Sequence, residues 1–168
     1  MNSSLPVFLE PTPVEKMFNR VFGFLVGMGV GFPHKYLLEV RGRKSGKLYS
    51  TPINLLERNG KRFLVAPRGR TQWVRNAEAG GEVALKKGST RLRFRLRPVA
   101  DAEKPEILKA YLDGFKSEVQ RYFSVAAGSP AEAFVEVSAR YPVFELLAEA
   151  PYKKVETGDL PVSGSLSS

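Results

Sequence analysis

Short apolar segments separated by turn residues run along most of the chain, and they predict strands. The breaks between them fall at glycine, asparagine and proline, which is typical of a β-rich domain. About six segments have strand length, namely residues 36–41, 48–57, 62–66, 82–87, 90–98 and 143–147. Asn59-Gly60 is a strong hairpin turn signal. Pro52 lacks a backbone donor, which predicts an edge strand or a bulge within the second segment.

Helical spacing of apolar residues marks the remaining elements. Residues 70–79 predict a short helix centred on Trp73. A second helix is expected to be capped by Asp101 and to run to about residue 123. Residues 129–132 read Ser-Pro-Ala-Glu, which combines a capping box with proline at the first helical position. This motif predicts a third helix that ends near Tyr141.

These elements predict a mainly β domain with helices, in the α+β class. Short strands joined by hairpins favour a closed or nearly closed antiparallel barrel with helices over its ends. The single domain is expected to cover residues 13–150, after a loose lead of residues 1–12. Residues 151–168 end in a Ser/Gly-rich stretch and are expected to form a disordered tail.

Composition excludes several classes of active site. The 168 residues include no cysteine, which removes disulfides, thiolate metal sites and cysteine nucleophiles. His34 is the single histidine, so neither a histidine triad nor a multi-histidine metal centre is expected. We therefore expect no metal site. The absence of cysteine fits a reducing compartment, and we expect a cytoplasmic protein.

The net charge of +9 favours an anionic partner. Nucleic acid is not expected, because no zinc finger, basic zipper or RNP-type aromatic strand is present. In the segment of residues 90–98, arginines alternate with apolar residues and so share one face of the predicted strand. These arginines are Arg91, Arg93, Arg95 and Arg97. That face is either a solvated surface or an anion-binding one.

The N-terminal region combines a helical pattern with an uncharged stretch. Residues 14–28 predict a helix whose apolar face consists of Val14, Phe18, Val21, Phe22 and Leu25. The uncharged residues 21–32 are too few to span a bilayer, and no cleavage site of a signal peptide follows them. We expect this helix to pack on its own barrel near the pocket, with weak contact to a membrane surface as the alternative.

The strongest local feature is the basic turn at Gly42-Arg43-Lys44-Ser45-Gly46. Two glycines allow a tight turn, and successive N–H groups in such a turn form an anion-binding nest. Arg43 and Lys44 add full charges, and Ser45 adds a hydroxyl donor. A P-loop is excluded, because its glycine spacing differs and it places Ser or Thr after the lysine. The turn therefore either binds a phosphate or polycarboxylate, or is a solvated hairpin turn.

The basic turn opens an ordered series of motifs. Thr51-Pro52, Asn59-Gly60, Val65-Ala66-Pro67-Arg68-Gly69 and Gln72-Trp73-Val74-Arg75-Asn76 follow it. Over residues 14–100 the series resembles the deazaflavin (coenzyme F420)-dependent nitroreductase family, whose fold is a split β-barrel of the pyridoxamine phosphate oxidase-like type. The resemblance implies a split antiparallel barrel and coenzyme F420 as the cofactor, with FMN as the alternative.

The same resemblance implies roles for nine residues. Arg43, Lys44 and Ser45 are expected to hold the phosphate and the glutamyl tail of the cofactor. Pro52 and Asn54 match positions beside the deazaflavin ring, and the remaining contacts are expected from Pro67, Arg68, Gln72 and Trp73. Two positions depart from the family pattern, since relatives that activate nitro compounds often have Tyr where Asn54 stands, and Pro67 lacks the hydroxyl of a serine. Trp73 is equally compatible with core packing.

The implied function is hydride transfer from reduced F420 to a conjugated or nitro organic acceptor, a small-molecule substrate. The alternative is a non-catalytic split-barrel protein that binds a flavin, haem or lipid. Tyr111, Tyr122 and Tyr141 are candidate proton donors, although each also suits the core. By analogy with small barrels of this kind, we expect a homodimer.

Overall fold

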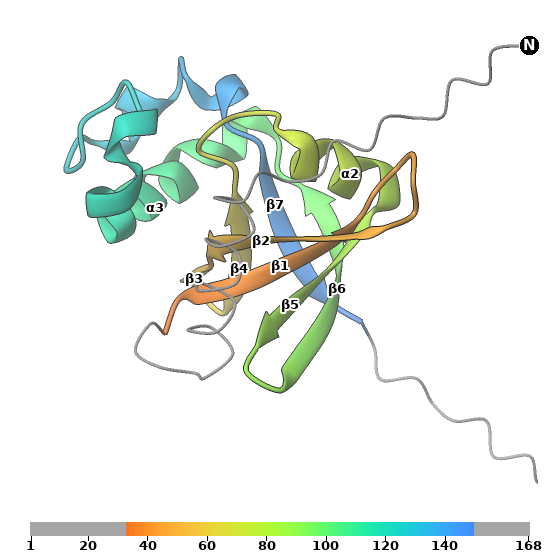
Figure 1. Ribbon diagram of the computed structural model, residues 1–168. Coiled ribbons are helices and arrows are strands. Elements are labelled where there is room, and N and C mark those ends of the chain that lie inside the picture. Colours follow the sequence, from red (N-terminus) through yellow and green to blue (C-terminus); the bar gives the residue numbers. More distant parts are fainter. Residues whose placement is uncertain (1–32, 150–168) are drawn as a thin grey trace, which may run out of the picture.

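The computed structural model describes residues 33–149, which form a curled antiparallel sheet with two α-helices packed against it (Figure 1). Its strands are β1 (Lys35–Arg41), β2 (Leu48–Asn54), β3 (Leu56–Arg58), β4 (Lys61–Val65), β5 (Glu82–Lys87), β6 (Thr90–Pro98) and β7 (Val143–Ala148). Its helices are α2 (Gln72–Gly80) and α3 (Lys104–Val119). The expected lead, the expected helix at residues 14–28 and the expected tail lie outside the described residues.

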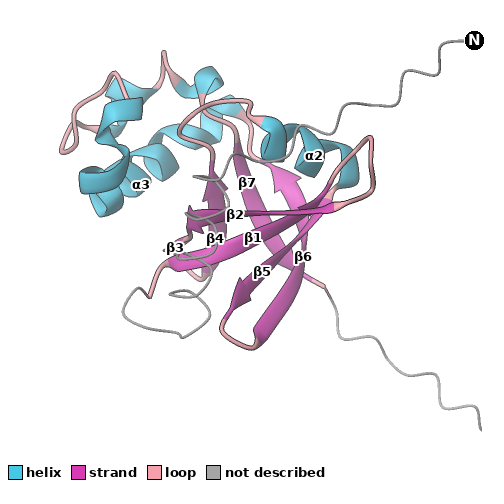
Figure 2. Ribbon diagram, viewed as in Figure 1, coloured by secondary structure: helices cyan, strands magenta, loops and turns pink. Residues whose placement is uncertain are grey.

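The seven strands follow the order β2-β1-β5-β6-β7-β4-β3, so β2 and β3 lie at opposite edges of the sheet. Only Leu55 separates these two strands along the chain. The two edges must therefore meet at Leu55, which curls the sheet into a barrel (Figure 2). The Leu55 N–H donates to the carbonyl of His34 at 2.8 Å and secures the junction.

The turns have the conformations that their residues favour. Asn59 and Gly60 both adopt positive φ, at 51° and 72°, which is the conformation of a hairpin turn that joins β3 to β4. Pro52 lies on the edge strand β2, where it faces Leu37 of β1 in register. The edge position that the proline predicted is therefore confirmed.

Two hydrophobic clusters stabilise the described residues. Inside the barrel, Leu64 of β4 packs with residues of the other strands, and Val74 and Ala77 of α2 close one end. Outside it, Phe63 and Val65 of β4 pack against α3 in a second cluster. Because successive side chains of a strand point to opposite faces, β4 is buried on both sides. Each fully buried side chain of this size contributes about 1.5–3 kcal/mol.

Three expectations about elements need correction. The segment predicted as one strand at residues 48–57 is divided into β2 and β3. The helix predicted to run to residue 123 ends at Val119, and 3₁₀ turns occupy residues 101–103 and 120–122. The helix predicted after residue 129 is wrong, since only 3₁₀ turns form there, at Ala131–Phe134 and Ser138–Arg140. Ser138 Oγ donates to the Phe134 carbonyl at 2.7 Å, which offers that backbone group a partner outside a regular helix.

Candidate functional site

A cavity of about 1520 Å³ lies between the β1–β2 hairpin, the loop from β4 to α2, and the end of α3. Its lining includes all nine residues that the resemblance assigned to the cofactor: Arg43, Lys44, Ser45, Pro52, Asn54, Pro67, Arg68, Gln72 and Trp73. The β1–β2 hairpin contributes five of these residues, and the loop from β4 with the start of α2 contributes the other four. The barrel therefore brings together the motifs that the sequence only orders along the chain.

The lining of the cavity is strongly basic. Among the described residues that line it, the cationic side chains are Lys35, Arg43, Lys44, Arg68, Lys116 and Arg121, and the single carboxylate is Glu118. Within residues 33–149, Glu118 pairs with Lys35, and no carboxylate pairs with Arg43, Lys44 or Arg68. A concave surface with this surplus attracts an anionic ligand.

The basic turn joins β1 to β2 and contacts α2. Arg43 Nη1 donates to Gln72 Oε1 at 2.9 Å and to Asn76 Oδ1 at 2.8 Å. The backbone N–H of Arg43 also donates to Asn76 Oδ1, at 3.2 Å. These acceptors are neutral amides, so they orient the guanidinium without neutralising it. Its remaining N–H groups are available to a ligand.

Gly42 shows how closely the backbone of this turn is packed. A Cβ atom at this position would lie 2.7 Å from Ser45 Oγ and 2.7 Å from the ring of Tyr49. Ser45 Oγ also accepts from the N–H of Lys47 at 3.2 Å, which holds the turn in shape. The glycine is therefore required by the close approach of these two side chains.

The N-terminus of α2 faces the same cavity. Thr71, Gln72 and Trp73 line it, and the first turn of the helix contains no acidic residue. Thr71 Oγ1 is buried and has no hydrogen-bond partner in the described part of the chain. The N–H groups at a helix N-terminus carry a partial positive charge that favours anions. An unpaired buried hydroxyl and this helix end together suit a polar, anionic ligand.

The far end of the cavity contains a polar group that we call the Lys35–Asn54–Glu118 cluster. Lys35 Nζ donates to Asn54 Oδ1 at 3.0 Å and forms an ion pair with Glu118. Asn54 Nδ2 donates to Glu118 Oε2 at 3.2 Å. Partial burial opposes ionisation of Glu118, but the bonds from Lys35 and Asn54 outweigh it, and the pKa of Glu118 is lowered.

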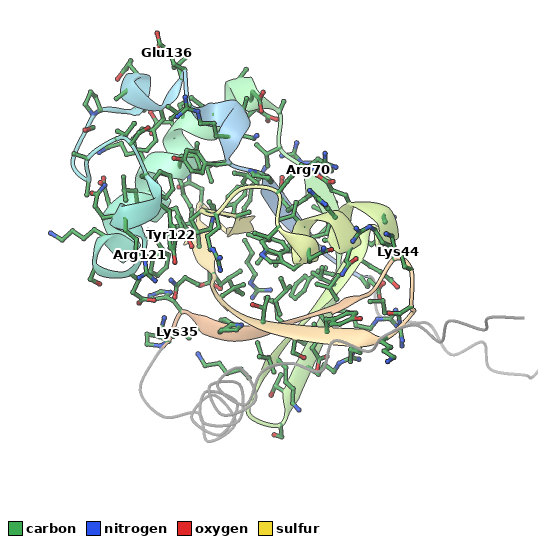
Figure 3. The ribbon with its side chains drawn as sticks, turned by 45° about the horizontal axis from the view of Figure 1, so that its top comes forward. Lys35, Lys44, Arg70, Arg121, Tyr122 and Glu136 are labelled. Atoms are coloured by element: carbon green, nitrogen blue, oxygen red, sulfur yellow. The ribbon has the colours of Figure 1, made fainter. Side chains whose placement is uncertain are left out.

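The basic turn and this cluster lie at opposite ends of the β1–β2 hairpin. Lys35 faces Asn54 at the open end, and Arg41 faces Leu48 next to the turn. At about 3.3 Å per residue, the two ends are about 20 Å apart. Figure 3 shows Lys44 well separated from Lys35, Arg121 and Tyr122.

Comparison with known proteins identifies the family. The model of the family described as F420H(2)-dependent quinone reductase matches residues 14–126, about two thirds of the chain. The chain belongs to the F420H2-dependent quinone reductase family. The enzyme is therefore an F420-dependent oxidoreductase, and coenzyme F420 is its cofactor, as the resemblance implied. No curated protein sequence matches the chain at a significant level.

Solved structures that resemble the reductase share its fold. A protein of unknown function from Agrobacterium tumefaciens, Atu2129, has 19% identity and a TM-score of 0.53, over 87% of this chain and 60% of that one. The haem storage protein HutZ from Vibrio cholerae has 11% identity and a TM-score of 0.50, over 70% of this chain and 82% of that one. An F420-H2 dependent reductase, FDR-A, has 23% identity and a TM-score of 0.48, over 70% of this chain and 96% of that one. The fold is a split β-barrel of the α+β class.

The residues of the cavity fit an F420 molecule. The cofactor bears a phosphate and a glutamyl tail, and the cavity supplies unpaired cations, a helix N-terminus and a buried hydroxyl in Thr71. Between its two polar ends the reductase provides apolar surface from Pro52, Ile53 and Trp73. Trp73 contacts Phe144 of the barrel core at 6.2 Å between ring centroids and also lines the cavity.

The three candidate tyrosines of the reductase occupy different places. Tyr122 is half-buried and lines the cavity, with the guanidinium of Arg121 over its ring at 4.8 Å. Tyr141 is buried, and its hydroxyl donates to the Tyr122 carbonyl at 3.0 Å. Tyr111 is buried as well, and burial raises its pKa well above the usual value. Of the three, only Tyr122 lines the cavity.

Among the lining residues that were not singled out from the sequence are Lys35, Thr71, Asn76 and Glu118. Asn76 follows Gln72 by four residues on α2, and that spacing places both on one helix face, so it was open to prediction. Thr71 falls within the helix predicted at residues 70–79, whereas in the structure it is the residue that precedes α2. Lys35 and Glu118 are 83 positions apart and share no local pattern.

The stripe of alternating arginines is a solvated, ion-paired face rather than part of the cavity. Arg91 pairs with Glu39, Arg93 with Glu82, and Arg97 with Glu145. None of these arginines lines the cavity. Arg91 and Arg97 thereby provide partners for two buried carboxylates, since Glu39 is 8% exposed and Glu145 is 7% exposed.

Proposed function

We propose that the cavity binds coenzyme F420 with its acidic tail at the basic turn and its ring toward Pro52 and Trp73. One observation carries this proposal, namely that the nine expected contact residues all line one cavity with six cations and one carboxylate. In this arrangement Arg43, Lys44 and Ser45 bind the phosphate and the tail. Charge-assisted hydrogen bonds of this type contribute about 1.5–3 kcal/mol each.

We further propose that the acceptor is a conjugated compound of the quinone type, with nitro compounds as a second group to be assayed. The description of the family supports the quinone class. The acceptor would bind near the Lys35–Asn54–Glu118 cluster, because that end of the cavity is farthest from the tail. Bound F420H2 supplies the hydride, and the protein orients the reactants and excludes water from them.

Residues 116–122 complete the wall at this end. Phe115 has non-helical φ and ψ of −124° and 24°, so α3 is kinked immediately before these residues. The kink leads the chain along the cavity, and every residue from Lys116 to Tyr122 lines it. We propose that Tyr122 contacts the acceptor through its half-buried ring. The buried Tyr111 and Tyr141 act instead as supports for this wall.

The experiment that tests the proposal is oxidation of F420H2, followed by its absorbance, with a panel of quinones and nitroaromatic compounds. Multiple turnovers with a quinone are expected. Turnover with nitro compounds alone would contradict the proposed acceptor class and leave the reductase activity intact. Failure to bind F420 would contradict the assignment of the cavity.

A homodimer and a cytoplasmic location stay proposals. Leu48 and Tyr49 are 46% and 50% exposed on the edge strand β2, and an exposed apolar edge is a typical site of association. None of the helices in residues 33–149 is long and apolar enough to cross a membrane. Light scattering at several protein concentrations, with F420 bound, tests the dimer. A monomer at every concentration would refute it.

A further inference from the structure

The Lys35–Asn54–Glu118 cluster has a composition that packing alone does not require. Lys35 begins β1, Asn54 ends β2 directly opposite, and Glu118 belongs to α3. The side chain of Lys35 is 19% exposed and Asn54 is 8% exposed, so both are largely removed from bulk water. Removing the Lys35 ammonium from water is costly even though the Glu118 side chain stays 46% exposed, and an apolar residue in place of Lys35 would pack α3 against the sheet without this cost. The charges are therefore explained better by a ligand in the cavity.

The ammonium of Lys35 has one donor more than the cluster uses. A lysine ammonium has three N–H groups. Asn54 Oδ1 accepts one and Glu118 Oε2 accepts another, and no further acceptor for Lys35 occurs among residues 33–149. Because Lys35 lines the cavity, the remaining N–H is available to a molecule bound there. Figure 3 places Lys35 toward the same side of the cavity as Arg121 and Tyr122, away from Lys44.

We propose that Lys35 is the catalytic proton donor to the acceptor, an inference that rests on the proposed function. Addition of a hydride to a quinone-type acceptor leaves an electron pair on an acceptor oxygen, which becomes an anion. Lys35 donates its remaining N–H to this oxygen. The proton then transfers, so that an N–H bond breaks and an O–H bond forms, and the neutral amine takes a proton back from water.

Asn54 and Glu118 are positioning residues in this step. Their oxygens accept two N–H groups of the ammonium and so direct the third into the cavity. Asn54 is itself held on both sides, since it donates to Glu118 and accepts from Lys35. The cluster thus prepares one donor before the acceptor binds.

The test compares wild type with Lys35→Ala, Lys35→Arg and the control Lys86→Ala. Lys86 lies on β5 opposite Leu37 of β1, is exposed and does not line the cavity. General acid catalysis contributes about 10²–10⁴-fold, so Lys35→Ala should lower kcat with a quinone by at least about 100-fold. The dissociation constant for oxidised F420 should change far less than kcat, because the charge-assisted contacts to the tail are about 20 Å away. Lys86→Ala should match wild type.

Chemical rescue separates proton donation from a structural role. Added ethylamine should restore part of the rate of Lys35→Ala in proportion to its concentration, because a small amine can occupy the space of the lost ammonium. Lys35→Arg should stay slow, because a guanidinium gives up no proton. The Tyr122→Phe variant is measured in the same assay as a comparison. Ethylamine should not raise its rate, because this variant retains Lys35.

Several results would overturn the role of Lys35 while wild type is active with quinones. One is a kcat of Lys35→Ala within about threefold of wild type, because that loss is far below a general-acid effect. The others are a fully active Lys35→Arg variant, and a rate of Lys35→Ala that does not rise when ethylamine is added. If Lys35→Ala does not fold, Lys35→Met, which keeps the apolar stem, replaces it under the same criteria. A wild type that binds F420 but reduces no quinone would refute the acceptor class itself, and the role of Lys35 with it.

Discussion

Replacing Arg43 with alanine tests the assignment of the basic turn, and the structure sets the size of the effect. One charge-assisted contact to the cofactor tail contributes about 1.5–3 kcal/mol. At about 1.4 kcal/mol per factor of ten, the dissociation constant for F420 should rise about 10- to 150-fold. Fluorescence titration of F420 into the purified protein measures this value.

The same substitution should have little effect on folding. Asn76 is 7% exposed, so loss of all its partners would be costly. However, Asn76 Oδ1 also accepts the backbone N–H of residue 43 at 3.2 Å, and alanine keeps that donor. Gln72 is exposed and can bond to water instead. The free energy of unfolding should therefore fall by less than about 1.5 kcal/mol, the upper value for one hydrogen bond.

Arg95→Ala is the matched control for the loss of one positive charge. Arg95 is exposed on β6 and does not line the cavity. Wild-type affinity should fall as salt is raised, and that dependence should be weaker in Arg43→Ala than in Arg95→Ala. If the two variants bind F420 with the same affinity, Arg43 makes no specific contact and the reasoning about the turn is refuted.

Three further substitutions test other parts of the structure. Gly42→Ala should weaken F420 binding, because its Cβ would meet Ser45 Oγ and the Tyr49 ring at 2.7 Å, and unchanged titration would contradict this close approach. Leu108→Ala should lower the free energy of unfolding by about 2–5 kcal/mol in urea melts, because Leu108 of α3 is fully buried in the outer cluster, and a loss below about 1 kcal/mol would be inconsistent with that core. Tyr111 has a raised pKa, so its stabilising contribution is complete below the unfolded value of about 10 and is lost as pH rises beyond it. Tyr111→Phe should therefore show a smaller fall of Tm than wild type above pH of about 10, and parallel curves would argue against the raised pKa.

Local chemistry was sufficient to predict the β1–β2 hairpin, the basic turn and α2. In the same way, Asn59-Gly60 determines the turn between β3 and β4, because both residues adopt positive φ. Gly42 and Gly46 bracket the cations, and the N–H of Gly46 donates to the Gly42 carbonyl at 2.9 Å. These signals depend on residues within a few positions of one another. The resemblance of the ordered motifs then indicated the cofactor correctly.

Elements that depend on distant contacts were harder to predict. The break at Leu55 arises because the chain must leave one edge of the sheet and join the other, which no local pattern encodes. The helix predicted after residue 129 does not form, because the expected capping box is absent, with Pro130 before the 3₁₀ turn and no side-chain cap, and the Ser138 hydroxyl bonds to the Phe134 carbonyl. The Lys35–Asn54–Glu118 cluster joins three elements through tertiary packing. Such a cluster is visible only in the folded chain.

Titration of the wild-type protein with coenzyme F420 and with FMN, at low and high salt, is the decisive test of the cofactor and of its site. The account predicts saturable binding of one F420 per chain, weakened by salt because unpaired cations of the cavity bind the anionic tail. It also predicts weaker binding of FMN, which has a phosphate but no glutamyl tail. Tighter binding of FMN, or no saturable binding of F420, would contradict the assignment of this cavity.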